Sequence, residues 1–179
     1  LDESNELHRR ELFSRIMLAQ ALLLTSQGII FLHAGQEYGR TKSAKSLTDK
    51  NHHDIIGHFV KNSYNAPDSI NNFIWQKGIE YEELRDFTRM LISLRKKNEH
   101  FRIHSREEIK SRVKLLEDAS GDLLLCYKIM PASAVSGTVW YLIFSGRKTI
   151  STIDIEENLS EAQVYVYGSR ASLDPFLLP

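Results

Sequence analysis

The stretch that decides the fold reads Gly28-Ile29-Ile30-Phe31-Leu32-His33-Ala34-Gly35-Gln36-Glu37-Tyr38-Gly39-Arg40. Four large apolar residues follow Gly28 without interruption, and such a short run is typical of a strand buried on both faces of a parallel sheet. Ala34 and Gly35 are small enough to let backbone or ligand approach closely. The stretch therefore predicts a buried strand over residues 29–32, with polar groups at its carboxyl end.

The same stretch resembles the eighth barrel strand of the α-amylase superfamily, in which a glycine and an apolar run precede Gly-(Asp/Gln)-Glu. The strings FLHAGQEY at 31–38, RTK at 40–42 and NSYNAPDSINN at 62–72 are similar to one branch of it, the type I pullulanases. These enzymes hydrolyse α-1,6 branch links. The strings lie in the order of the family, and the resemblance covers roughly residues 6 to 100. The tripeptide at 35–37 alone is weak evidence, whereas the long strings together are specific.

The length of the chain limits what it can be. A complete (β/α)8 barrel needs about 250 residues, and this chain has 179. We therefore expect an α+β chain that forms the C-terminal end of such a barrel, with its last strand and flanking helices, followed by an antiparallel β-sandwich. The expected barrel portion covers residues 1–104, and the expected all-β domain covers residues 105–179.

The composition argues against several partners. The chain carries 23 basic and 23 acidic residues, so it offers no clustered charge of the kind that binds nucleic acid or an anionic membrane. A neutral polysaccharide is compatible with this balance. Its single cysteine, Cys126, excludes an internal disulfide and a cysteine-rich zinc site. We expect Cys126 to pack inside a strand. No compartment follows from these features.

Three helices are predicted. Residues 2–27 form the first, which we expect to be buried almost all round, because two apolar stripes lie side by side on it. The first stripe consists of Leu12, Ile16, Ala19 and Leu23. The second consists of Phe13, Met17 and Leu24. Residues 80–98 form an amphipathic helix with acids in its first turns and bases in its last, which suits the helix dipole. A short helix over 105–112 begins with a capping-box pattern, Ser105 and Glu108.

From about residue 113 the pattern changes to short segments rich in Ile, Val and Tyr. Strands are predicted over 113–117, 123–130, 139–144, 149–155 and 163–167, and turn residues separate them. Strands at such spacing indicate an antiparallel sandwich. Members of the superfamily carry a β domain at this place, so the resemblance implies the same fold.

Residues 41–72 show no periodicity and are predicted to be a long polar loop. Within it His52, His53, Asp54 and His58 are metal-ligand types. Metal ligands need a fixed geometry and supporting hydrogen bonds, which a loop rich in Ser, Lys and Asn does not promise. We therefore expect a solvated loop with no metal site, and nothing in the sequence implies a cofactor.

No catalytic residue is assigned to this chain. A retaining glycosidase needs two carboxyl groups about 5 Å apart, and the resemblance places these and a third acid on earlier barrel strands, before Leu1. We therefore expect this chain alone to be inactive. Glu37 is expected to have a structural role, with its carboxylate tied into backbone hydrogen bonds. His33 is expected to be a core histidine.

The chain can instead contribute sugar binding. The resemblance implies that Asp68, and Asn72 four residues later, contact glucose units. Residues at i and i+4 of a helical turn point the same way, and carboxylates and amides suit sugar hydroxyls. Some relatives carry Arg where this chain has Asn72. The alternative for Asp68 is that it only caps a short helix. Tyr64 and Arg40 are further candidates.

We interpret the chain as the C-terminal part of a debranching enzyme acting on α-1,6 links in pullulan, glycogen or related α-glucans. Its expected partners are the α-glucan and the N-terminal remainder of the enzyme, without which residues 29–32 would be exposed. The alternatives are an isoamylase or a branching enzyme, or a free-standing carbohydrate-binding module. Such modules use exposed aromatic rings, whereas Trp140 is predicted to lie in a central apolar strand.

Overall fold

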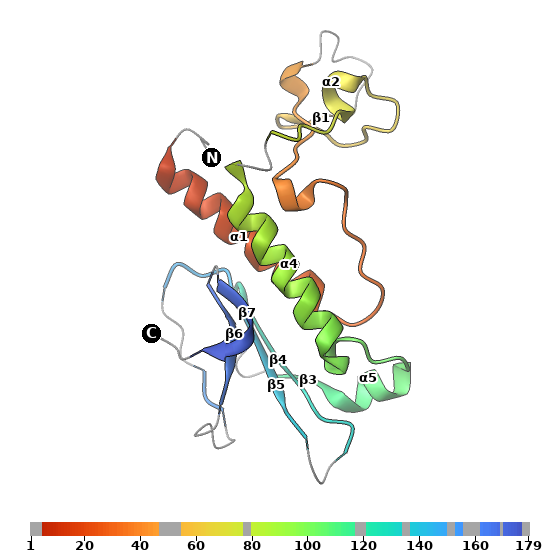
Figure 1. The fold of residues 1–179 in the computed structure, drawn as a ribbon, viewed down its shortest axis with the longest axis vertical. Coiled ribbons are helices and arrows are strands. Elements are labelled where there is room, and N and C mark those ends of the chain that lie inside the picture. Colours follow the sequence, from red (N-terminus) through yellow and green to blue (C-terminus); the bar gives the residue numbers. More distant parts are fainter. Residues whose placement is uncertain are drawn as a thin grey trace. The chain divides into compact units, whose positions relative to one another are not determined.

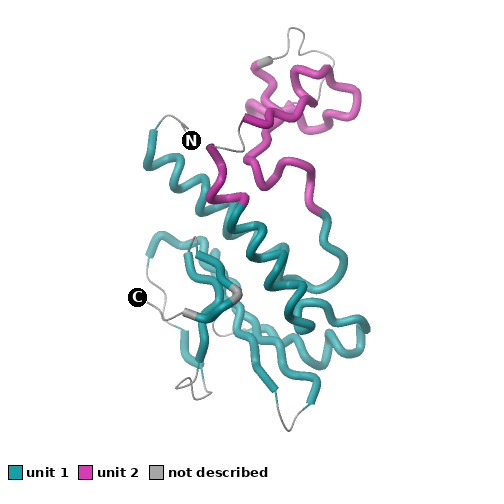
Figure 2. The backbone as a smooth tube through the Cα atoms, in the orientation of Figure 1, with its two compact units in different colours: residues 1–31, 86–179 teal, residues 32–85 magenta. Residues whose placement is uncertain are grey.

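The structure, a computed structural model, describes residues 5–46, 55–76, 80–116, 121–133, 137–149, 153–155, 162–168 and 170–176. The chain divides into two compact units (Figure 2). Unit 1 consists of residues 1–31 and 86–179, and unit 2 of residues 32–85. These units differ from the two domains predicted from the sequence, whose boundary near residue 104 stays a prediction.

Helix α1 (Glu6–Thr25) lies in unit 1, and helix α4 (Glu82–Lys97) belongs to unit 1 from Asp86 on. The two helices lie side by side and run in the same direction (Figure 1). Asn5 caps α1, since its Oδ1 accepts a hydrogen bond of 3.0 Å from the amide of Leu7. Phe13, Met17 and Leu24 are buried on one face of the helix. The prediction of burial almost all round was wrong, because Ala19 in the other stripe is exposed and its three companions are only half-buried.

Helix α4 confirms the amphipathic pattern predicted for residues 80–98. The apolar residues of that pattern are all buried: Tyr81, Leu84, Phe87, Leu91 and Leu94. At its end, the Arg95 guanidinium donates to the carbonyl oxygens of Leu24, Ser26 and Gly28 at 3.0, 2.7 and 2.8 Å. Arg95 therefore satisfies carbonyl groups at the end of α1, in addition to suiting the dipole of its own helix.

The predicted short helix is α5 (Arg106–Arg112), which follows the 3₁₀ turn η3 (Glu99–Phe101). The Oγ of Ser105 accepts a hydrogen bond of 3.1 Å from the amide of Glu108. This is the N-cap half of the capping box, and it confirms Ser105 as the cap.

Five antiparallel strands of unit 1 form two sheets. The first has the order β3 (Val113–Leu115), β4 (Leu124–Ile129) and β5 (Trp140–Ser145), and the second pairs β6 (Val164–Tyr167) with β7 (Arg170–Phe176). The rings of Trp140 in β5 and Tyr165 in β6 lie 5.1 Å apart. Cys126 is fully buried in β4, which confirms that it packs inside a strand.

Three details of the predicted β region were wrong. Strand β5, which carries Trp140, lies at an edge of its sheet, because β4 is the central strand. The strand predicted over 149–155 is absent at residues 149 and 153–155, while the three residues between them lie outside the described residues. Strand β7 was not predicted, because Pro175 and several polar residues mask it, but pairing with β6 supplies its ladder of hydrogen bonds.

The predicted strand over 29–32 is not formed. The segment has no regular secondary structure and pairs with no described strand, and Ile29 and Phe31 are 100% and 84% exposed. A β-strand needs hydrogen-bonded neighbours, so an apolar run cannot become a strand by itself. His33 is exposed as well, which corrects its prediction as a core histidine. The exposure of the run agrees with our expectation for this chain without covering segments.

Unit 2 was expected to contain mainly a loop, yet it has local structure. It contains the 3₁₀ turns η1 (Gln36–Tyr38) and η2 (Ala44–Ser46), the hairpin of β1 (Ile55–Ile56) and β2 (Phe59–Val60), and the short helix α2 (Asp68–Asn71). Ala44, Val60 and Ile70 form a small buried core. This core fixes α2 against the hairpin and η2. The chain as a whole is a mixed α and β structure with small antiparallel sheets.

Candidate functional site

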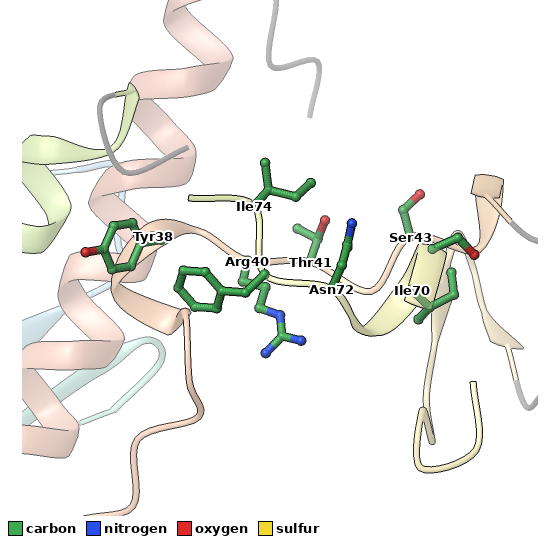
Figure 3. A pocket seen from close by; sticks show the side chains of 9 residues that line it. Tyr38, Arg40, Thr41, Ser43, Ile70, Asn72 and Ile74 are labelled. Carbon is green, nitrogen blue, oxygen red and sulfur yellow. The ribbon is translucent and has the colours of Figure 1, made fainter. Parts of the chain in front are cut away.

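A pocket of about 180 Å³ lies in unit 2, between the chain after η1 and the chain around α2 (Figure 3). It is lined by Tyr38, Arg40, Thr41, Ser43, Ser69, Ile70, Asn72, Phe73 and Ile74. The lining mixes hydroxyl, amide and guanidinium groups with apolar and aromatic side chains. Two of the four predicted binding residues, Arg40 and Asn72, are among them.

Asp68 and Asn72 lie at the two ends of α2. Asp68 is the first helical residue, and the amide of Asn72, the C-cap, donates to the Asp68 carbonyl at 2.8 Å. Both side chains are exposed, and neither makes a hydrogen bond or ion pair with another described residue. The N-cap is Pro67, which has no capping side chain. The alternative of Asp68 as an N-cap is therefore wrong, and its carboxylate is available to a ligand.

Arg40 lines the pocket, but its guanidinium is used within the chain. Nη1 donates to the carbonyl of Ala34 at 3.0 Å, and Nη2 donates to the carbonyl of Asn71. The guanidinium also lies over the Phe73 ring, 5.6 Å from its centroid. In Figure 3 the Arg40 guanidinium and the Asn72 amide point in opposite directions. Arg40 thus joins the two walls of the pocket.

Tyr64 does not line the pocket. Its side chain is 94% exposed, and its backbone amide donates to Oδ1 of Asn62 at 3.2 Å. The structure therefore brings Arg40 and Asn72 to one pocket, places Asp68 one helical turn before Asn72, and leaves Tyr64 on the open surface of unit 2.

Asn71 was not predicted as a site residue, yet its side chain makes several polar contacts within unit 2. Its Nδ2 donates to the carbonyl oxygens of Ser63 and Ala66 at 2.7 and 2.9 Å. Its Oδ1 accepts from Nζ of Lys42 at 2.6 Å. Burial, and then the charge of Arg40, lower the pKa of Lys42. An asparagine beside another asparagine gives no sequence signal for such a role.

A row of aromatic rings adjoins the pocket and was also missed. Phe73 lies 5.4 Å from Tyr38 and 4.4 Å from Trp75, and Trp75 is 72% exposed. Gly35 makes room for this row. It has φ of 90°, and a Cβ there would lie 2.8 Å from the Phe73 ring and 2.7 Å from Cδ of Arg40. The sequence prediction that Gly35 permits a close approach is thus confirmed.

The remaining residues singled out from the sequence are Glu37 and the histidine-rich stretch of the loop over residues 41–72. The Glu37 carboxylate makes no hydrogen bond with the described residues, so the expected ties to the backbone are absent. Of the predicted metal-ligand types, residues 52–54 lie outside the described residues and His58 is exposed. The described part of the chain holds no group of three or more potential metal ligands. Among the described residues, no helix has the length and apolar character needed to cross a membrane.

The sequence is similar to curated pullulanases. It is 34% identical over 140 residues to pullulanase A of Streptococcus pneumoniae. This alignment covers 64% of this chain and 11% of that protein. It is 35% identical over 116 residues to the pullulanase of Bacillus subtilis. That alignment covers 65% of this chain and 14% of the relative. The chain thus spans a small part of the length of both relatives. No protein-family model matches the sequence.

The fold is similar to that of solved structures of a glycogen-degrading module and of a pullulanase. The catalytic module of SpuA, a multi-modular glycogen-degrading pneumococcal virulence factor, matches all of this chain with a TM-score of 0.82 at 25% identity, over 29% of its own length. The pullulanase of Paenibacillus barengoltzii, in complex with maltohexaose and α-cyclodextrin, matches 75% of this chain with a TM-score of 0.60 at 28% identity. By sequence and by fold, this chain is a homologue of part of the pullulanases.

Proposed function

We propose that this chain is part of a glycoside hydrolase that cleaves α-1,6 branch links of α-glucans by a retaining mechanism. The observation that carries the proposal is the similarity to pullulanases in sequence, at 34% identity, together with the match of the whole chain to a glycogen-degrading catalytic module. Because the chain spans 29% of that module, the activity belongs to a larger protein.

Within that protein the chain would supply part of the end of the catalytic barrel and a following β-sandwich, with the boundary near residue 104. Residues 29–32 would be the last barrel strand once neighbouring strands pair with it. The exposure of Ile29 and Phe31 supports this, because exposed apolar side chains are costly unless another segment covers them. The N-terminal remainder of the enzyme would be that segment.

The contribution of this chain to catalysis would be substrate binding. The Asp68 carboxylate and the Asn72 amide are exposed on one helical turn and have no partner among the described residues, so sugar hydroxyls can reach them. A solved relative binds maltohexaose, an α-glucan oligosaccharide. Arg40 and Tyr64 remain candidates, although the guanidinium of Arg40 already donates to two carbonyl groups.

The test is an assay of the whole protein that contains this chain, with pullulan and glycogen as substrates. We expect new reducing ends from pullulan, and maltotriose as the product of cutting each α-1,6 link. This chain alone, which carries no assigned catalytic acid, should release none. Debranching of glycogen with pullulan untouched would indicate an isoamylase. Transfer of chains without new reducing ends would indicate a branching enzyme, and either result would overturn the proposal.

A further inference from the structure

We propose that Asn71 is a positioning residue for glucan binding, which holds the segment 63–72 in the shape that presents Asp68 and Asn72. This inference rests on the proposed function. Asn71 itself does not contact the glucan, because its side chain is half-buried and its polar atoms are occupied within unit 2.

The contacts of Asn71 join three separate stretches of unit 2. Both hydrogens of its amide go to carbonyl oxygens before α2, those of Ser63 and Ala66, at 2.7 and 2.9 Å. Its Oδ1 accepts from Lys42 at 2.6 Å, and its backbone carbonyl accepts from Arg40. A neutral amide has two N–H donors and one acceptor oxygen, so both donors of this side chain are used and its oxygen has a partner. One residue therefore ties the loop before α2, the helix itself and residues 40–42 together.

The position of Asn71 makes these contacts important for its neighbours. Helix α2 has four residues, Asp68 to Asn71, and so short a helix is unstable on its own because helix nucleation is costly. Its orientation must come from tertiary contacts. On its inner side Ile70 packs into the small core, and the polar side is held by Asn71. Asp68 and Asn72 then face outward on the same turn, as exposed groups.

The hydrogen bond from Lys42 also helps to hold Asn71 and helix α2 in place. Lys42 lies 29 positions before Asn71 in the chain, and the residue is half-buried. A hydrogen bond from a charged donor is stronger than one between neutral groups. Removing the lysine donor should therefore loosen α2 in the same way as removing the amide donors of Asn71. This gives two independent substitutions for one mechanism.

The experiment uses the whole enzyme and measures the Kd for maltohexaose by calorimetry, with kcat and KM on pullulan and the melting temperature of each variant. Asn71→Asp keeps the shape and the acceptor but places a carboxylate oxygen against two carbonyl oxygens. Lys42→Met removes the charged donor. The matched controls are Asn65→Asp, an exposed asparagine of the same segment, and Lys45→Met, an exposed lysine of η2. Each substitution is also made in an Asp68→Ala/Asn72→Ala background.

We expect Asn71→Asp and Lys42→Met to raise the Kd and KM about 5- to 30-fold, with kcat changed less, from the loss of two neutral bonds or one charged bond. The controls should leave the Kd unchanged. In the Asp68→Ala/Asn72→Ala background neither substitution should raise the Kd further. The side chains that Asn71 and Lys42 hold in place for the glucan are already absent there.

Three results would overturn the inference. An equal rise of Kd in both backgrounds would show that Asn71 acts independently of Asp68 and Asn72. A lower melting temperature with an unchanged Kd would make it a purely structural residue. A Kd that is unaffected by Asp68→Ala/Asn72→Ala but raised by Asn71→Asp would mean that Asn71 positions side chains other than those of Asp68 and Asn72. By contrast, a wild-type enzyme that neither binds maltohexaose nor cuts pullulan would refute the proposed function itself.

Discussion

The hydroxyl of Thr88 on α4 donates a hydrogen bond of 2.6 Å to Oε1 of Gln20 on α1, and both side chains are buried. Gln20 is fully buried, and its Nε2 has no hydrogen-bond partner among the described residues. A buried polar contact thus joins the two helices inside an apolar interface, in addition to the hydrogen bond from Arg95 to the carbonyl of Leu24.

Removing one half of this contact should cost more than removing both. Thr88→Val leaves Oε1 of Gln20 buried without a donor, which should lower the free energy of unfolding by about 1–3 kcal/mol. Thr88→Val combined with Gln20→Leu should cost less than Thr88→Val alone, since the buried Gln20 oxygen that loses its donor is then removed as well. Denaturant unfolding of the two variants measures the difference. A double variant less stable than the single one would contradict this account.

Arg95 should be the most sensitive arginine of α4. Arg95→Met removes donors to the carbonyls of Leu24, Ser26 and Gly28, so we expect a loss of about 2–4 kcal/mol in unfolding free energy. Arg89→Met is the matched control on the same helix. Arg89 pairs with Asp86 at 2.8 Å with both side chains half or more exposed, and such surface pairs contribute about 0–1 kcal/mol. Equal losses for the two variants would refute the capping role of Arg95.

Gly35 and Gly57 both have a left-handed φ, and replacing each by alanine distinguishes the cost of backbone strain from the cost of steric crowding. Gly35→Ala combines a φ of 90° with a Cβ placed under 3 Å from Arg40 and Phe73, whereas Gly57→Ala has a φ of 59° and no atom within 4 Å. Both should lose about 1 kcal/mol to strain, and Gly35→Ala about 1–3 kcal/mol more to crowding. Thermal unfolding gives the comparison. Because Arg40 and Phe73 line the pocket, only Gly35→Ala should also weaken glucan binding, and equal effects of the two would contradict this.

Asp68→Ala in the whole enzyme tests the proposed sugar contact. A hydrogen bond to a charged group contributes about 1.5–3 kcal/mol, so kcat/KM on pullulan should fall roughly 10- to 150-fold. The melting temperature should stay near that of the wild type, because the exposed carboxylate makes no contact with the described residues. Asn65→Ala on the same segment is the control. A lowered melting temperature with unchanged kcat/KM would show that Asp68 serves stability alone.

The thiol of Cys126 should be unreactive in the folded chain. Burial raises the pKa of Cys126, although the charge of Arg147 opposes this, and the thiolate is the reactive form. We expect no labelling by a disulfide reagent at pH 8 until denaturant is added. Because the folded state holds the proton more tightly than the unfolded state, stability should decline as the pH rises above the ordinary pKa of a thiol. Rapid labelling of the native protein would contradict the burial of this group.

The amino-acid sequence by itself determined the local elements of this protein. The 3–4 spacing of apolar residues predicted α4, and the capping box predicted the start of α5. Short segments rich in Ile, Val and Tyr, separated by turn residues, predicted β3, β4, β5 and β6. Each of these signals is short-range, because helix periodicity, caps, strand composition and turns depend on residues that are close in the chain. The strings at 31–42 and 62–72 likewise carried the resemblance to pullulanases, which the comparisons confirm.

Tertiary structure alone decided the rest, for physical reasons that a local pattern does not contain. Residues 29–32 have the pattern of a buried strand, but a strand forms only where partners offer hydrogen bonds, and none of the described segments does. Strand β7 has a poor pattern, yet β6 provides its partners. In the candidate site, Asn71 contacts residues 5, 8 and 29 positions away. The convergence of these segments, rather than the residue types, gives Asn71 its place in the site.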